Sequence, residues 1–317
     1  MRVMLATHAA QMLVGLLLDI VLGWPGPLYR RIGHPVGWLG RLIAAGDKAW
    51  NRDGAGFATR RIAGACLALR VIALAVAAGL VLAFVLPQGW LGAVLGGVLA
   101  WPWLAARSLH SHVAAVARPL GVGDVAGARH AVSMIVGRDP AALDEAGIVR
   151  AAAESLAENT SDGVIAPLFW GVVFGLPGLA GYKAINTLDS MIAYRTPRHL
   201  AFGWAAARVD DVANLIPARL TGLLYALASG QPAALRVMLR DARHHRSPNA
   251  GWPEAAFAGA LGVRLSGPRL YAEGPTQDPW LNAEAPDPMA ADLQRGLSLY
   301  RRVVGLAGLL LLSVEVL

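Results

Sequence analysis

Long apolar segments separated by short polar ones dominate the sequence of this chain. A helix needs about 20 mostly apolar residues to cross the hydrocarbon core of a bilayer. Four segments approach or exceed that length and are predicted to span a membrane: 5–24, 62–86, 90–106 and the shorter 303–317. Only the turn Pro87-Gln88-Gly89 joins the second segment to the third, which predicts a helical hairpin.

Two further segments are apolar but interrupted. The segment 163–182 contains Pro167, Pro177 and five glycines, a composition typical of a broken or re-entrant helix. The segment 202–228 has an apolar second half, but its first half carries charges that a lipid-facing helix does not tolerate. We therefore expect each of these two segments to be either spanning or re-entrant.

The charged residues between the segments predict the side on which each loop lies. Loops on the cytoplasmic side carry an excess of Lys and Arg, and residues 25–61 contain seven of them. We therefore expect 25–61 and 107–162 to be cytoplasmic and the N-terminus to be outside. Residues 229–300 hold eight of the 19 prolines, which predicts a loop-rich cytoplasmic section.

Taken together, the pattern predicts an all-α fold, a polytopic integral membrane helical bundle with one membrane-embedded domain over 1–317. Composition supports this class, because 56% of the residues are hydrophobic and only 15% are charged, against about 25% charged in soluble domains. The net charge of +7 suits anionic lipid or anionic substrates. No basic run is interleaved with aromatics, so nucleic acid is not an expected partner.

Three carboxylates are the first candidates for chemistry. Glu154, Glu158 and Asp162 are spaced four residues apart, so one helix face would carry all three. Carboxylates can hold Mg²⁺ that is bridged to phosphate oxygens. Two other interpretations stay open: a solvated helix face for Glu154 and Glu158, and a helix cap at Asp162 before Gly163.

Other polar residues lie inside or beside apolar segments, where ionisable groups are costly and have a functional role or an interior partner. They form three groups: Lys183 with Asn186 and Asp189; Arg208 with Asp210, Asp211 and Asn214; and Arg243, Arg246 and Asn249 in a cationic turn. Arg and Lys bind carboxylates or phosphates. Lys183 can instead reach the membrane interface, and Asp210 and Asp211 can simply pair with Arg208. No P-loop motif is present.

Several long motifs resemble one family. They are HPVGWLGRLI (34–43), SMIVGRDP (133–140), LDEAGIVRAAAESLAENTSDGVIAPLFW (143–170), GYKAINTLDSMIAYRTPR (181–198), FGWAAARVDDVANLIPARLT (202–221) and HRSPNAGWPEAAFAGALGVRLSGP (245–268). These segments are similar to those of the cobalamin biosynthesis proteins CbiB/CobD. The likeness covers nearly the whole chain. It departs from the family pattern at Trp24, where an acidic residue is usual, and in GPRLYAEG (267–274).

The resemblance implies a bacterial inner-membrane, multi-pass ligase of cobalamin biosynthesis, the adenosylcobinamide-phosphate synthase. Such an enzyme joins the free carboxyl of adenosylcobyric acid, a corrinoid, to (R)-1-amino-2-propanol phosphate or a related amino-alcohol. It implies ATP and Mg²⁺ as cofactors and an active site on the cytoplasmic side. Membrane lipid and other corrinoid-pathway proteins are the partners that it implies.

In this reaction each polar group has an expected role. A carboxylate needs activation before it forms an amide, and a base must keep the amine neutral. We expect Glu154, Glu158 and Asp162 to supply the metal and base roles, and Lys183 and Asp189 to belong to the catalytic centre. The residues expected to bind substrate are Asn159, Asn186, Arg195, Arg198, Arg208, Asp210, Asp211, Asn214, Arg243, Arg246 and Asn249.

Two other classes compete with the ligase. A transporter or binding protein for an anionic solute also has broken helices and buried charges, but this chain has few spans and no internal repeat. A membrane phosphotransferase of the CDP-alcohol type would share the Asp162-Gly163 step, yet the following Val-Ile-Ala-Pro lacks its pattern. The sequence does not identify the ATP site, the preferred amino-alcohol or the carboxylate that acts as base.

Overall fold

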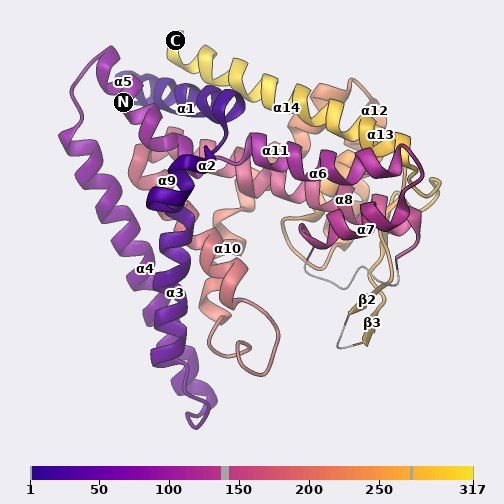
Figure 1. Ribbon diagram of the computed structural model, residues 1–317, viewed down its shortest axis with the longest axis horizontal. Coiled ribbons are helices and arrows are strands. Elements are labelled where there is room, and N and C mark those ends of the chain that lie inside the picture. The colour runs from indigo at the N-terminus through magenta and orange to yellow at the C-terminus, as the bar shows by residue number, and fades with distance from the viewer. Residues whose placement is uncertain (1, 137–142, 272–273, 317) are drawn as a thin grey trace. The chain divides into compact units, whose positions relative to one another are not determined.

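Helices form almost all of the computed structural model, which describes residues 2–136, 143–271 and 274–316 (Figure 1). The end of the SMIVGRDP motif and residues 272–273 of GPRLYAEG lie outside the described residues. The chain divides into two compact units. The first unit comprises 1–105, 166–214 and 310–317, and the second comprises 106–165 and 215–309.

Every regular element described in the first unit is a helix. Its helices are α1 (Arg2–Leu22), α2 (Gly26–Ile32), α3 (Pro35–Trp50), α4 (Phe57–Val85), α5 (Trp90–Ala100), the 3₁₀ turn η1 (Trp101–Trp103), α9 (Ala166–Ile192) and α10 (Trp204–Ala213). Helix α4 packs along both α3 and α9. Helix α1 packs on α5 and α9, so α9 is the element that most of the unit contacts.

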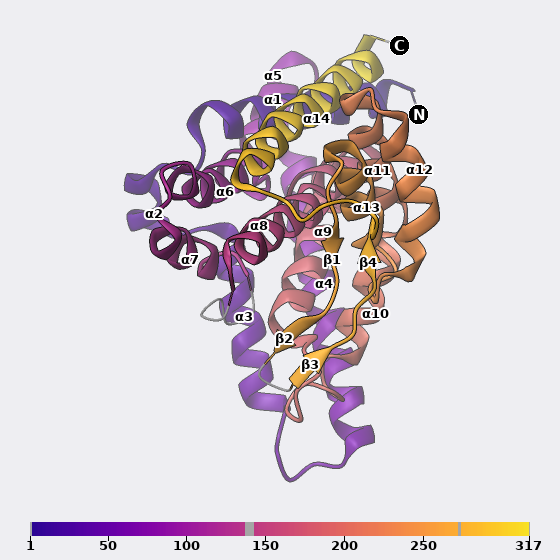
Figure 2. The same cartoon turned by 90° about the vertical axis from the view of Figure 1, so that its right-hand side faces the viewer.

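The second unit adds a small amount of strand to its helices. Its elements are α6 (Ala106–Leu120), α7 (Val125–Ser133), α8 (Glu145–Thr160), the π-helical turn η2 (Ser161–Ile165), α11 (Leu215–Ser229), α12 (Pro232–Asp241), η3 (Ala242–His244), α13 (Gly251–Leu261), β1 (Leu265–Ser266), β2 (Arg269–Tyr271), β3 (Gly274–Thr276), β4 (Trp280–Leu281) and most of α14 (Ala290–Val316). Antiparallel pairs join β1 to β4 and β2 to β3 (Figure 2). Helices α6, α7 and α8 contact one another.

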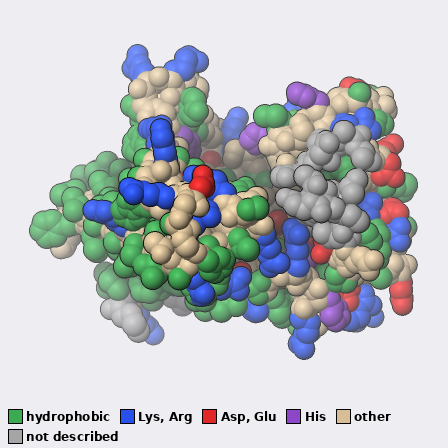
Figure 3. All heavy atoms as spheres, turned by 90° about the horizontal axis from the view of Figure 1, so that it is seen from below, with side chains coloured by type: hydrophobic (Ala, Val, Ile, Leu, Met, Phe, Trp, Pro, Cys, Tyr) green, Lys and Arg blue, Asp and Glu red, His purple; other side chains and the backbone are tan. Residues whose placement is uncertain are grey.

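Four helical segments of the described chain are long and apolar enough to cross a membrane: Arg2–Leu22, Phe57–Val85, Glu145–Ile192 and Ala290–Glu315. Helices α10 and α11 pass the same test together as a bent pair. Exposed hydrophobic side chains, with Lys and Arg beside them, are prominent on the face seen in Figure 3. These features are those of an all-α polytopic membrane protein.

Helix α5 is shorter than the span predicted over 90–106. It has 11 residues and ends at Ala100, where the 3₁₀ turn η1 with Pro102 begins. At 1.5 Å per residue it is about 16 Å long, roughly half of the 30 Å hydrocarbon core. It therefore does not reach across a bilayer, and it packs instead against helix α1.

Helix α9 is broken at Gly175, inside the segment 163–182. Gly175 has φ 68° and ψ −154°, and Pro177 follows two residues later. A β-carbon at Gly175 would lie 2.7 Å from Nε2 of His8, so only glycine fits there. The other ring nitrogen of His8, Nδ1, lies 3.1 Å from the carbonyl oxygen of Val172. Helix α1 thus contacts the backbone of α9 at its break.

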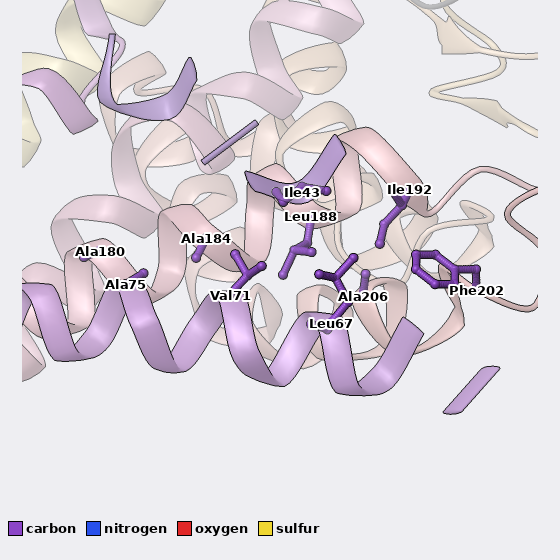
Figure 4. Packing of buried hydrophobic residues seen from close by; sticks show 11 residues of the cluster. Ile43, Leu67, Val71, Ala75, Ala180, Ala184, Leu188, Ile192, Phe202 and Ala206 are labelled. Atoms are coloured by element: carbon purple, nitrogen blue, oxygen red, sulfur yellow. The ribbon is translucent and has the colours of Figure 1, made fainter. Parts of the chain in front are cut away.

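The buried core of the first unit joins helices α3, α4 and α9 to α10 (Figure 4). Leu67 and Val71 of α4 meet Leu188 and Ile192 of α9, and alanines between them let the helix axes approach closely. Gly64 of α4 lies directly against the backbone that precedes α10, since a β-carbon there would lie 1.8 Å from the carbonyl oxygen of Phe202. This packing fixes the second half of α9, which carries Lys183 and Asp189.

Candidate functional site

The three carboxylates spaced four residues apart do not share one environment. Glu154 is buried on helix α8, whereas Glu158 on the same helix is exposed. Asp162 lies in the π-helical turn η2, whose wider winding departs from the four-residue α-helical spacing. Among the described residues no group of three or more His, Cys, Asp or Glu side chains is arranged to hold a metal ion. The magnesium site predicted from these three carboxylates together is therefore not formed, because they differ in burial and in helical geometry.

Glu154 instead accepts a hydrogen bond from the backbone. Its Oε1 accepts from the N–H of Ser266 at 2.8 Å, and both residues are buried. Ser266 has φ 63°, a left-handed conformation that costs a residue other than glycine about 1–3 kcal/mol. The carboxylate therefore helps to hold the end of strand β1 in a strained conformation. Asn159, one turn after Ser155, donates its Nδ2 to the Ser155 carbonyl oxygen at 2.9 Å.

Lys183 is buried in the second half of helix α9, with 7% of its surface exposed. His34 is the N-cap residue of helix α3. Its Nδ1 accepts a hydrogen bond from the N–H of Val36 at 3.2 Å. Burial lowers the pKa of His34, and the charge of Lys183 lowers it further. Since Nδ1 is an acceptor, Nε2 carries the proton of the neutral ring. The ammonium group of Lys183 and the neutral ring of His34, with its Nε2–H donor, are therefore close enough to interact electrostatically.

Carboxylates from helices α9 and α10 form another polar group in the first unit. Arg208 Nη2 lies 2.9 Å from Asp211 Oδ2 on α10. Asp189 on α9 is close enough to interact electrostatically with both residues. The like charges of Asp189 and Asp211 repel each other, and Arg208 offsets that repulsion. The structure thus brings together three residues that the sequence placed in two separate groups.

A chain of hydrogen bonds completes the cluster. Asn214 caps helix α10 and donates its Nδ2 to Asp210 Oδ2 at 3.0 Å. The hydroxyl of Tyr182 donates to Asn214 Oδ1 at 3.0 Å, which links α9 to the end of α10. Trp170 Nε1 donates to the carbonyl oxygen of Ala213 at 3.0 Å. We call Lys183, Asp189, Arg208, Asp210, Asp211 and Asn214 the α9–α10 site.

The two arginines after helix α9 differ from each other in their contacts. Arg195 is exposed, whereas the Arg198 guanidinium contacts Asp47 Oδ2 through Nη2 at 2.8 Å and Nε at 3.3 Å. Asn51 donates to Asp47 Oδ1 at 2.7 Å and to the Arg198 carbonyl oxygen at 3.0 Å. Arg198 was predicted to bind substrate. Its guanidinium is already bound to the Asp47 carboxylate, so a substrate phosphate would have to compete with Asp47. Asn186 is half-buried on α9.

Asp47 gives the first unit a pH-dependent contribution to stability. Burial alone would raise its pKa, but hydrogen bonds from Arg198 and Asn51 outweigh burial and lower it. The contribution is therefore complete above the unfolded pKa of about 4 and is lost as pH falls through the lower folded pKa. We expect Asp47→Asn to lower the apparent melting temperature at pH 7, and the gap to wild type to close towards pH 3.

The matched control for this prediction is Asp53→Asn. Asp53 lies 3.8 Å from Arg198 Nη1, but 86% of its side chain is exposed. Its replacement is expected to leave the melting curve unchanged across the same pH range. Melting followed by tryptophan fluorescence in one detergent would test both variants, and an Asp47→Asn gap that persisted unchanged at pH 3 would contradict the assignment.

The cationic turn of the second unit is organised around Asn249. Arg219 Nη1 lies 3.4 Å from Asn249 Oδ1, and the Arg219 guanidinium stacks 4.4 Å from the Trp252 ring. The backbone N–H of Asn249 donates to Ser247 Oγ at 3.3 Å. Arg243 and Arg246 are exposed at this turn. The turn therefore presents two cations at its surface, with the buried Asn249 fixed below them.

Sequence reasoning did not assign several residues that these clusters use. His245 Nε2 lies 3.8 Å from Glu254 Oε2, and both side chains are buried. His34, Asp47 and Arg219 were likewise given no role. His34, His245 and Glu254 lie within motifs that resemble the family, and that position could have identified them as candidate site residues. Asp47 carried none, because its partner lies 151 residues away.

The α9–α10 site contains carboxylates and cations, the residue types that hold a metal-bound phosphate in other proteins. Proteins usually hold Mg²⁺ with one or two carboxylates while substrate phosphates and water complete its coordination. Asp189 and Asp211 are a like-charged pair of that kind, and Lys183 and Arg208 are cations in the same unit. The observation that supports the fit is that Asp189 and Asp211 lie on two helices in contact, α9 and α10, close enough to interact electrostatically.

Comparisons with known proteins identify the family. The model of the CobD/Cbib protein family matches residues 12–300. The chain is 64% identical to the cobalamin biosynthesis protein CobD of Rhodobacter capsulatus, over 93% of this chain and 94% of that protein. It is 51% identical to that of Brucella suis over 90% of each, and 49% identical to that of Rhizobium meliloti over 86% and 85%. No solved structure matches. The chain therefore belongs to the CobD/Cbib family.

Proposed function

We propose that this protein is an acid–amine ligase of cobalamin biosynthesis, an adenosylcobinamide-phosphate synthase. It joins adenosylcobyric acid to (R)-1-amino-2-propanol phosphate or a related amino-alcohol. The observation that carries the proposal is the 64% identity, over 93% of the chain, to a protein named for cobalamin biosynthesis. The α9–α10 site supports it, because it combines cations with carboxylates as this chemistry requires.

In the proposed reaction the cations of the site bind anionic groups. Lys183 and Arg208 neutralise the negative charge that gathers when a carboxylate and a phosphate are brought together. Lys183 is buried, so water screens its charge less than it screens the charge of the exposed Arg208. Asn214, held by Tyr182 and Asp210, keeps the end of α10 fixed while substrate binds.

The carboxylates of the site have two proposed tasks. Asp189 and Asp211 would hold Mg²⁺, which would neutralise phosphate charge, and a carboxylate of this site would accept the proton that the amine loses. ATP supplies the activation that an unactivated carboxylate lacks. Glu158 is exposed in the second unit and stays a candidate base.

The cationic turn is proposed to bind the larger substrate. Arg243 and Arg246 are exposed and can reach the periphery of the corrinoid or the phosphate of the amino-alcohol. Arg219 and Trp252 hold Asn249, the buried residue of this turn. The side chains proposed to touch substrate are therefore exposed, and hydrogen bonds hold the turn that carries them.

We place the protein in the inner membrane of a bacterium, with its site on the cytoplasmic side where ATP is available. Several apolar helices support the membrane assignment. The segment 25–61 with its seven basic residues supports the orientation. Membrane lipid and other proteins that act on corrinoids are the proposed partners.

The test is the reaction itself with purified protein in detergent. Adenosylcobyric acid, (R)-1-amino-2-propanol phosphate and Mg-ATP are incubated with the protein, and adenosylcobinamide phosphate is measured by mass spectrometry. We expect product that is lost when ATP or Mg²⁺ is omitted. Folded protein that forms no product would contradict a self-sufficient ligase.

A transporter for an anionic solute is the second candidate, and the break of helix α9 at Gly175 favours it. Broken helices bind solutes in many transporters. Reconstitution into liposomes separates the two functions. Accumulation of adenosylcobyric acid without product would support transport, whereas product without accumulation supports the ligase.

A further inference from the structure

Two residues of the second unit have a left-handed backbone that glycine adopts far more readily than other residues. Ser266 has φ 63° and Asn282 has φ 56°, and no other non-glycine residue that the structure describes has a positive φ. They lie at one end of the antiparallel β1–β4 pair, since Ser266 ends β1 and Asn282 directly follows β4. Strained residues of this kind persist only where their surroundings hold them, and they cluster at clamps and switch regions.

Each of these two residues donates its backbone N–H to a buried carboxylate. The N–H of Ser266 donates to Glu154 Oε1 of helix α8 at 2.8 Å. The N–H of Asn282 donates to Asp241 Oδ2 at the end of helix α12 at 2.7 Å. Both carboxylate residues are only 6% exposed. Two helices, α8 and α12, thus hold the two strands of one pair.

Arg240 fixes the second of these carboxylates. Its Nε and Nη2 donate to the two oxygens of Asp241 at 2.6 and 2.8 Å. Burial alone would raise the pKa of Asp241, but the hydrogen bonds from Arg240 and from the N–H of Asn282 outweigh burial and lower it. The acceptor that holds Asn282 is therefore an ionised group, and hydrogen bonds to ionised groups are about twice as strong as neutral ones.

Contacts between the strands couple the two strained residues. Ser266 pairs with Trp280 across the strands. The Nδ2 of Asn282 donates to the carbonyl oxygen of Val263 at 3.1 Å. The ring of Trp280 packs on the backbone of Gly267, where a β-carbon would lie 2.5 Å from it. Because these contacts cross from one strand to the other, a movement that releases one strained residue disturbs the other.

We propose that the β1–β4 pair is a latch that opens as one unit and exposes the carboxylate of Glu154. Glu158 lies four residues further along the same face of α8 and is already exposed. The closed latch therefore leaves one carboxylate accessible on this face, and the open latch presents two. Backbone strain favours opening, whereas the two hydrogen bonds to carboxylates oppose it. The latch (Figure 2) lies within the second unit and does not depend on the proposed ligase reaction.

Amide hydrogen exchange of the full chain in maltoside detergent measures opening at both anchors. Mass spectrometry follows the peptides that contain Ser266 and Asn282. Asp241→Asn replaces an ionised acceptor with a neutral one and is expected to raise exchange at Asn282 about tenfold. A latch that opens as one unit also exchanges faster at Ser266, whose own acceptor is unchanged. Glu154→Gln is the reciprocal variant and should raise exchange at Asn282 as well as at Ser266.

Carbodiimide labelling with glycine ethyl ester measures the exposure of Glu154 itself. Glu158 is the internal reference, because it is exposed on the same helix. In wild type we expect Glu154 to react much more slowly than Glu158. Asp241→Asn should raise the labelling rate of Glu154 about tenfold, in parallel with amide exchange, and leave that of Glu158 unchanged.

Glu145→Gln is the matched control. Glu145 is exposed in the first turn of α8, the helix that carries Glu154. Its replacement should leave exchange at Ser266 and Asn282, and the labelling of Glu154, as in wild type. Unchanged exchange in helix α6 would show that all three variants remain folded.

The outcomes decide the proposal. Faster exchange at Ser266 together with faster labelling of Glu154 in Asp241→Asn supports the latch. Faster exchange at Asn282 alone would overturn it, because the two ends would then open independently. Equal labelling of Glu154 and Glu158 in wild type would also overturn it, as would faster exchange at Ser266 without faster labelling of Glu154.

Discussion

Replacing Lys183 with Met is expected to reduce the formation of adenosylcobinamide phosphate at least about 100-fold. Removing one preorganised donor from a site that stabilises developing charge typically costs about 10²–10³ in kcat. Lys183 fits that role because it is a buried cation on helix α9, the helix that also carries Asp189. Met has a similar length and carries no charge. Product formed per mole of protein, measured by mass spectrometry, gives the effect.

The sequence supplies its own control, since Lys48 is the only other lysine in the chain. Lys48 is exposed in the last turn of helix α3. Lys48→Met is therefore expected to keep full activity. Circular dichroism and size-exclusion chromatography would establish that both variants are folded. Full activity in folded Lys183→Met would remove this residue from the catalytic centre.

The second large effect is expected at Gly64, where helix α4 meets the backbone near Phe202. In Gly64→Ala the new β-carbon would lie 1.8 Å from the Phe202 carbonyl oxygen, and no side-chain rotation can relieve a clash with backbone. Overpacking of this kind costs about 1–3 kcal/mol and sometimes more. We expect a markedly lower apparent melting temperature in detergent.

Gly37→Ala is the control for this prediction. Gly37 lies on helix α3 of the same unit, and no atom would lie within 4 Å of its added β-carbon. Alanine is favoured over glycine in a helix by about 1 kcal/mol, so this variant should be as stable as wild type or slightly more so. Equal melting temperatures for both variants would show that α4 can move away from Phe202 at little cost.

The fold was predictable where the pattern was long and uniform. The apolar runs near 5–24 and 62–86 correspond to helices α1 and α4. A long apolar segment in a membrane forms a helix because its backbone N–H and C=O groups must pair with one another. The run at 90–106 was misleading, since Pro102 and two tryptophans continue the apolar character beyond the end of helix α5. Hydrophobicity alone does not show where a helix ends.

The candidate site was predictable in residue type and less so in arrangement. The groups around Lys183 and Asp210 were identified from their cost in an apolar segment, and the structure places them on helices in contact. The carboxylates at 154, 158 and 162 were grouped by α-helical spacing, which the π turn at Ser161 changes. Pairs such as Asp47 with Arg198 depend on tertiary packing, and no local pattern reveals them.

The break at Gly175 has a consequence for the assembly of the protein in the membrane. A helix interrupted in hydrocarbon leaves carbonyl groups without their usual donors, at a cost of several kcal/mol each. For Val172 the ring of His8 lies within hydrogen-bonding distance, although the two residues are 164 positions apart. With Nδ1 protonated, His8 can donate to that carbonyl. Helix α1 precedes α9 in the chain, so a side chain that can pair with this carbonyl group is already made when α9 is synthesised.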